Sequence, residues 1–158
     1  MPITENDIVQ ALSGRFPGLE PTIQRERRIW LEASRSEYLE VLVYLHGELG
    51  FPVLAMVTGL DTGEEFQLIY HVNTLDGMLV NIRVRAPYDD PVFDSVCDIY
   101  KGSVIYEAEA RNLLGLTING IPKQIRYPLP DGWPEGNYPL RKDWQPEGAD
   151  SVDNEGSD

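Results

Sequence analysis

The sequence has few of the residues that bind metals. Its 158 residues include one cysteine, Cys97, and two histidines, His46 and His71. None of these has the spacing of a zinc site, and an iron–sulfur cluster needs about four thiolates. A single cysteine also excludes an internal disulfide, which is usual in the cytoplasm. We therefore expect no metal or cofactor in this chain, with both histidines on the surface and Cys97 in the core.

Basic residues and long apolar runs are also scarce. The chain has 13 Lys and Arg residues against 26 Asp and Glu residues, a net charge of −13. Nucleic acid binds to a surface rich in Lys and Arg, so the composition predicts no nucleic-acid partner. No apolar run reaches 18 residues, which predicts no direct membrane span. Neither glycine-rich nucleotide-binding motif is present, so nucleotide and flavin sites have no support.

The hydrophobic periodicity predicts one α/β (α+β) domain over residues 1–120. Helices are expected over 4–16, 35–49, 91–100 and 103–114, and strands over 22–32, 53–60, 66–72 and 79–85. The nearly continuous apolar run at 53–60 predicts a central strand, whereas the alternation at 66–72 predicts a half-buried one. Thr4 with Asp7 and Ser34 with Glu37 have the spacing of helix caps.

Three acids in "YDDPVFDSVCD" invite a catalytic interpretation. Asp90, Asp94 and Asp98 are four residues apart, so they would share one face of the helix expected over 91–100. A free-standing enzyme could use such carboxylates as an acid–base pair. The structural alternative is stronger, because an acid before Pro91 is a common helix start and the other two acids would form its solvated side.

The stretch "YPLPDGWPEGNYPLRKDW", residues 127–144, fits neither a helix nor a central strand. Its four prolines remove backbone donors, yet it carries Trp133 and Trp144. We assign residues 121–146 to an extended arm and the acidic residues 147–158 to a disordered tail. The arm could fold back on its own domain. Its aromatic, proline and arginine content favours a partner-binding role, and a soluble adaptor for small proline-binding modules is a weaker alternative.

The segment from Tyr106 to Trp144 resembles the 30-kDa subunit of the respiratory NADH:quinone oxidoreductase. The resemblance covers about residues 86–144 in three ordered blocks. The matching residues are Glu107 and Glu109, then Gly115, Gly120, Pro122 and Arg126, then Trp133, Pro139, Leu140, Arg141, Lys142 and Asp143. The family's fold is a two-layer α-β-β-α-β-β-β arrangement, which implies a mixed sheet with helices on one face.

Several positions depart from the pattern of the quinone-linked enzymes. Ala108 replaces an arginine, Arg111-Asn112 replaces a tyrosine–aspartate pair, and Ile121 and Lys123 replace a histidine and an aspartate. The same type of subunit occurs in membrane-bound energy-converting [NiFe] hydrogenases, where the second block is looser. The departures therefore favour the hydrogenase branch over a quinone-linked NADH dehydrogenase.

The resemblance also implies a role. It predicts a non-catalytic subunit on the cytoplasmic side of the membrane that docks on a large catalytic subunit, beside a small iron–sulfur subunit. Iron–sulfur, nickel–iron or quinone sites would lie in those partners. The implied interface comprises Glu107, Glu109, Arg126, Trp133, Tyr138, Pro139, Leu140, Arg141, Lys142, Asp143 and Trp144. The tryptophans would then pack on another chain.

Overall fold

The structure, a computed structural model, describes residues 3–121 and 125–146. The tail expected over 147–158 lies outside the described residues. Along the chain the elements are α1 (Glu5–Arg15), β1 (Thr22–Arg25), β2 (Arg28–Glu32), α2 (Tyr38–Gly47), β3 (Val53–Asp61), β4 (Glu65–Asn73), β5 (Leu79–Pro87), β6 (Val92–Asp94), α3 (Ser103–Leu114) and β7 (Thr117–Asn119).

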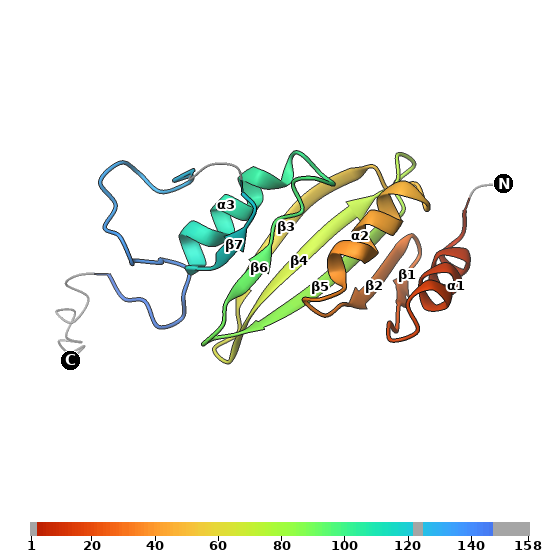
Figure 1. Cartoon of the computed structure of the whole chain (residues 1–158), viewed down its shortest axis with the longest axis horizontal. Helices are drawn as coiled ribbons and strands as arrows, with labels where there is room; N and C mark the ends of the chain where they lie inside the picture. Colours follow the sequence, from red (N-terminus) through yellow and green to blue (C-terminus); the bar gives the residue numbers. More distant parts are fainter. Residues whose placement is uncertain (1–2, 122–124, 147–158) are drawn as a thin grey trace, which may run out of the picture.

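A mixed five-stranded sheet forms one layer of the domain. Its strand order is β1-β2-β5-β4-β3, and β2 runs parallel to β5 while the other neighbours are antiparallel. The helices α2 and α3 lie over the same face of this sheet (Figure 1). The predicted α/β class, with a mixed sheet and helices on one face, is confirmed.

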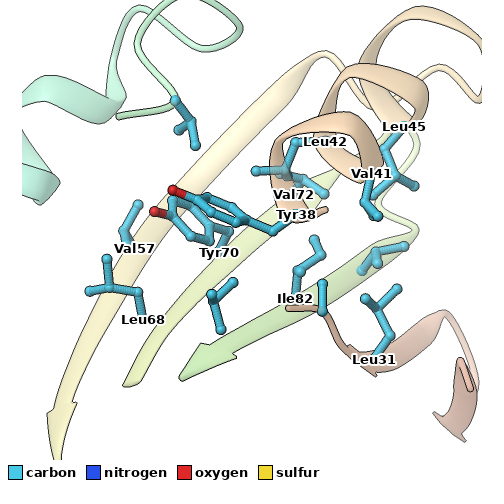
Figure 2. Packing of buried hydrophobic residues seen from close by; sticks show 14 of the residues in the cluster. Leu31, Tyr38, Val41, Leu42, Leu45, Val57, Leu68, Tyr70, Val72 and Ile82 are labelled. Carbon is cyan, nitrogen blue, oxygen red and sulfur yellow. The ribbon is translucent and has the colours of Figure 1, made fainter. Parts of the chain in front are cut away.

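The core lies between α2 and the strands. Figure 2 shows Val41, Leu42 and Leu45 of α2 directed toward β4 and β5, with Tyr38 stacked on Tyr70 at a ring-centroid distance of 5.6 Å. All five side chains have no exposed surface. Burying one such aliphatic or aromatic side chain contributes about 1.5–3 kcal/mol to the free energy of unfolding. This layer is therefore the main source of the domain's stability.

The first helix begins where its cap was predicted. The Thr4 hydroxyl accepts a hydrogen bond from the Asp7 N–H at 3.2 Å, and the Asp7 carboxylate accepts one from the Thr4 N–H at 2.9 Å. The second helix begins at Tyr38 rather than at residue 35. Ser34 and Glu37 do hydrogen bond to each other at 2.6 Å, but they close a turn that precedes the helix.

The single strand predicted over 22–32 was wrong, because the chain reverses inside it. Arg27 has a φ of 58°, in the left-handed region, and β1 and β2 form an antiparallel pair around it. The Arg27 N–H donates to the Glu5 carboxylate at 2.7 Å, and its guanidinium lies 3.1 Å from the Asp76 carboxylate. These contacts to α1 and to the β4–β5 turn fix a hairpin that the charged run "QRERR" does not reveal.

The positions of β3 and β4 in the sheet also differ from the prediction. β3 is an edge strand, not a central one. Val57 and Gly59 face α3, which packs so closely that a Cβ on Gly59 would lie 2.8 Å from Leu114 Cδ1, whereas Met56 and Leu60 are exposed. β4 is central and is buried on both faces from Phe66 to Tyr70. Alternation alone underestimated its burial, because side chains on both neighbouring strands flank the second face: Leu60 and Arg85 lie beside Gln67, and Thr58 and Arg83 lie beside Ile69.

The helix predicted over 91–100 does not form. Residues Val92–Asp94 are instead β6, which pairs in parallel with β7 in a small second sheet. Pro91 begins this segment, and its carbonyl accepts the Thr117 N–H at 2.9 Å. The three acids therefore do not share a helical face. Asp90 pairs with Arg35 at 2.8 Å, Asp94 accepts from the Asn119 side chain at 3.0 Å, and Asp98 lies 3.8 Å from Lys101.

Candidate functional site

The arm follows β7 and later returns to the domain at the C-terminal end of α3. In Figure 1 its described part, residues 125–146 in blue, makes a wide loop beyond α3. The return toward the domain begins at Tyr138, and the last described contacts reach the β3–β4 turn. The arm is thus both an outward loop and a segment docked on its own domain.

The helix end provides the first docking point. Gly115 is the C-cap of α3, with a φ of 73°, and a Cβ at this position would lie 2.6 Å from the Tyr138 ring. The Leu140 N–H then donates to the Leu113 carbonyl at 3.0 Å. A glycine here serves two purposes, since it allows the left-handed conformation and leaves room for the tyrosine.

Asp61, at the end of β3, is the second docking point. It accepts hydrogen bonds from the N–H groups of Lys142 and Gly63, both at 2.8 Å, and from the Tyr88 hydroxyl. Burial alone would raise the pKa of Asp61. The three donors, together with the Arg141 charge, outweigh burial and hold the pKa of this carboxyl below its usual range. The Lys142 ammonium donates to the Thr62 carbonyl at 2.9 Å.

Arg141 completes the docked segment. Its guanidinium lies 5.3 Å from the centroid of Phe66 and 5.4 Å from that of Tyr88, and these two rings stack 4.5 Å apart. Its Nε is 3.0 Å from the Asp143 carboxylate. Burial, and then the hydrogen bond to Asp61, raises the pKa of Tyr88 to about 12. The Tyr88 hydroxyl is protonated at physiological pH with or without this shift, so it can donate to Asp61.

The outward loop is held by side chains of α3. The Asn112 amide donates to the carbonyls of Ile125 at 2.6 Å and Tyr127 at 2.7 Å, and the Arg111 guanidinium donates to the same Ile125 carbonyl at 2.7 Å. Both α3 residues depart from the pattern of the quinone-linked enzymes. Their hydrogen bonds give the loop a defined shape without a hydrophobic core.

The two arm tryptophans contact each other. Their ring centroids are 6.2 Å apart, and Trp133 Nε1 donates to the Asn137 carbonyl at 2.9 Å. Both rings are half-buried in the chain. Tyr127 and Leu140, by contrast, are 50% and 56% exposed. The two tryptophans therefore pack partly against the arm itself, while Tyr127 and Leu140 remain exposed to solvent.

The implied interface residues fall into two groups. Glu107 has no exposed surface, and it ties α3 to the segment after β6 by accepting from the Val96 N–H at 2.8 Å and from the Ser95 and Ser103 hydroxyls. Burial raises the pKa of Glu107, and these three donors lower it in part. Glu107 therefore stabilises the domain from inside and has no surface to offer a partner. The partly or fully exposed residues are Glu109, Arg126, Trp133, Tyr138, Pro139, Leu140, Arg141, Lys142, Asp143 and Trp144.

Sequence patterns do not identify the residues that receive the arm. They predict only a turn at Asp61 and no element at Tyr88. They predict a helix stop at Gly115, but not that Tyr138 packs against it, and Asn112 stands out only as a departure from the family pattern. A glycine or a turn aspartate is common in any sequence, so only the tertiary contacts give these residues a role.

The remaining candidate side chains are the cysteine and the two histidines. Cys97 is buried, as predicted, and His46 is exposed beside Tyr100. His71 is half-buried rather than on the surface, and its ring nitrogens hydrogen bond to Thr58 at 2.9 Å and to Asn81 at 2.6 Å.

In residues 3–121 and 125–146, no three His, Cys, Asp or Glu side chains are placed to hold a metal ion. No helix in those ranges is long and apolar enough to cross a membrane.

A family model described as "Respiratory-chain NADH dehydrogenase, 30 Kd subunit" matches residues 31–150. The chain belongs to this family. The match includes the sheet from Leu31 onward, α2, α3 and the arm. The resemblance seen in the three sequence blocks is thereby confirmed over most of the chain.

Relatives in the family are subunits of membrane and respiratory enzymes. The chain is 32% identical to the membrane-bound hydrogenase subunit beta of Pyrococcus furiosus, over 94% of this chain and 91% of that protein. It is 33% identical to a subunit of the F(420)H(2) dehydrogenase of Methanosarcina mazei, over 87% of this chain and 90% of that protein.

A solved structure shows the same fold. A chain of the membrane-bound sulfane sulfur reductase, described as an archaeal respiratory membrane complex, superimposes with a TM-score of 0.79 and 26% identity. The superposition covers 97% of this chain and 95% of that one. The likeness therefore extends beyond the sheet and includes the region of the arm.

Proposed function

We propose that this chain is a non-catalytic peripheral subunit of a complex-I-like membrane oxidoreductase and that its arm docks on the large catalytic subunit. The observation that carries the proposal is the exposure of Tyr127 and Leu140 on an arm whose shape its own domain fixes. A segment held in its binding shape loses less conformational entropy on association, so its contacts contribute more to affinity.

The 32% identity to a subunit of a membrane-bound hydrogenase supports the hydrogenase branch. The F(420)H(2) dehydrogenase subunit matches the chain as well, and by its name it belongs to neither branch. The redox centres of such a complex, whether iron–sulfur, nickel–iron or quinone, would lie in the large subunit and a small iron–sulfur subunit. This chain would help to assemble and stabilise the complex on the cytoplasmic side of the membrane. A quinone-linked NADH dehydrogenase, the enzyme in the family's name, would use the subunit in the same way.

Two exposed leucines make a matched test of docking. Leu140 lies on the arm and is 56% exposed, whereas Leu75 is 86% exposed in the turn between β4 and β5. We expect Leu140→Asp to weaken co-purification with the large subunit by about tenfold or more, as for loss of an interface anchor. Leu75→Asp should have no effect on assembly.

Thermal unfolding of each isolated variant is the control for folding. Equal melting temperatures with selective loss of assembly for Leu140→Asp would support the arm as the docking element. If both variants assemble as the unmodified chain does, the arm is not the docking surface. If the unmodified chain fails to co-purify with any large subunit expressed from its own gene cluster, the proposed function is wrong.

A further inference from the structure

A cavity of about 420 Å³ lies between the C-terminal end of α3 and the outward loop of the arm. Arg111 and Asn112 line it from α3, and Arg126, Trp133 and Glu135 line it from the arm. Its wall thus combines an aromatic ring with two guanidinium groups. Tryptophan and arginine are among the residues most often found at energetic centres of protein interfaces.

The cavity keeps its shape through internal hydrogen bonds. Asn112 holds the Ile125 and Tyr127 carbonyls on one side. On the other side, the Arg126 guanidinium donates to the Trp133 carbonyl at 2.7 Å. Both sets of bonds lie within this chain, so the cavity exists in the isolated protein and does not need a partner to form.

The two arginines have donors left for a ligand. Each guanidinium carries five N–H groups, and the hydrogen bonds that Arg111 and Arg126 make to the described residues use only some of them. Within residues 3–121 and 125–146, neither lies within 4 Å of a carboxylate. Glu135 is the one acid among the lining residues, which leaves the wall with a net positive charge.

We infer that the cavity receives a segment of the partner chain that presents an Asp or Glu side chain to Arg111 and Arg126. An adjacent apolar side chain of that segment would pack on Trp133. The inference rests on the proposed function and names the chemistry of the partner at this site. A planar guanidinium pairs with a carboxylate through two parallel hydrogen bonds, which fixes the segment's orientation as well as its charge.

Opposite charge changes give the sharpest test. In the co-expressed complex, Arg126→Glu should weaken retention of the large subunit by about tenfold or more, as for the loss of one member of an interfacial charge pair. Glu135→Gln should strengthen it, because the wall becomes more positive. Because Arg126 also holds the Trp133 carbonyl, loss of arm structure would weaken binding in Arg126→Glu as well. It would not strengthen binding in Glu135→Gln, so the gain in that variant identifies an electrostatic contact. The matched control is Arg25→Glu, the same charge change at an exposed residue of β1.

A photo-crosslinking residue at Leu129, which lines the cavity, identifies the occupant by mass spectrometry. A crosslink to a partner segment with an acidic residue within a few positions supports the inference. A crosslink confined to this chain, a crosslink to a segment without acids, or equal retention in Arg126→Glu and Arg25→Glu overturns it. If the large subunit is retained only when citrate or phosphate is added, the cavity binds a small anion, and this result also overturns the inference. If the unmodified chain binds no large subunit, the proposed function fails, and this inference fails with it.

Discussion

The α/β domain and the arm keep their shapes by different means. The domain buries a continuous layer of apolar side chains between α2 and the sheet, with Leu42 and Tyr70 fully inaccessible. The arm buries little and depends on a few directional contacts, chiefly those of Asp61 and Asn112. Apolar burial is spread over many atoms, whereas a few hydrogen bonds can be lost one by one. The arm can therefore open locally while the domain stays folded.

This difference suits a docking element. The arm meets the domain at the end of α3 and at the β3–β4 turn, and its outward loop lies beyond α3 (Figure 1). A few weak ties are enough to bias its conformation, and a partner could still adjust it. The following predictions separate the two regions.

The largest effect is expected in the core. Leu42→Ala removes a fully buried side chain from the layer in Figure 2 and should lower the free energy of unfolding by about 2–5 kcal/mol. Denaturant unfolding measures this loss. Val43→Ala, one residue along α2 at a 56% exposed position, is the control and should change stability by less than about 0.5 kcal/mol. Similar losses in both variants would mean that α2 does not pack as described.

The next effect belongs to the arm's charged anchor. Asp61→Ala leaves the Lys142 N–H and the Tyr88 hydroxyl without their acceptor, which should cost the docked state about 1–3 kcal/mol. Hydrogen exchange at the Leu140 amide, which bonds to Leu113, should accelerate by about tenfold or more.

The control for this anchor is Asp131→Ala, at an exposed position of the arm. It should leave the exchange rate of the Leu140 amide unchanged. Faster exchange of the Gly63 amide with no change at the Leu140 amide would show that Asp61 supports only its own turn. Asp61 would then not hold the arm on the domain.

A smaller effect is expected at the helix end. Gly115→Ala places a Cβ in the left-handed conformation, at a cost of about 1–2 kcal/mol, and also against the Tyr138 ring. Repeating the substitution in a Tyr138→Ala background removes the steric part and isolates the backbone part. Gly102→Ala, which meets no atom within 4 Å, is the matched control. Equal costs in both backgrounds would show that Tyr138 does not dock on Gly115.

The smallest effect, less than about 1.4 kcal/mol per pH unit for a single group, is the response to pH. The pKa of Asp61 is lowered in the fold, so its contribution is complete above the ordinary aspartate value and is lost as pH falls through the folded pKa. The pKa of Glu107 is raised by burial, so the native state holds the proton longer and stability falls as pH rises above the ordinary glutamate value.

These opposite slopes distinguish the two regions in one titration. Acid should release the arm, seen as exchange at Leu140, while Glu107→Gln should abolish the loss of stability on the alkaline side of about pH 4.3. Denaturant unfolding between about pH 2 and pH 7 measures both slopes. The two substitutions should change the slope of the unmodified chain in opposite directions, and changes of the same sign in Asp61→Asn and Glu107→Gln would contradict these assignments.

Local signals in the sequence determined much of the domain. The cap at Thr4 and the periodicity of α1 and α3 depend on neighbours within a few residues, so a linear pattern can contain them. The family blocks likewise lie within one continuous segment, and composition alone indicated a chain without metal-binding motifs.

Long-range contacts decided the rest. The segment 91–100 has helical spacing, but Val92–Asp94 form β6 because they pair with a strand 25 residues later, in the register Val92 to Thr117, and a turn follows. The same holds for the hairpin at Arg27, whose ties come from α1 and from Asp76. The arm's docking on Asp61 joins residues 81 positions apart. The short windows from which helices, strands and turns are predicted never contain both partners of such a contact, so only the tertiary structure brings them together.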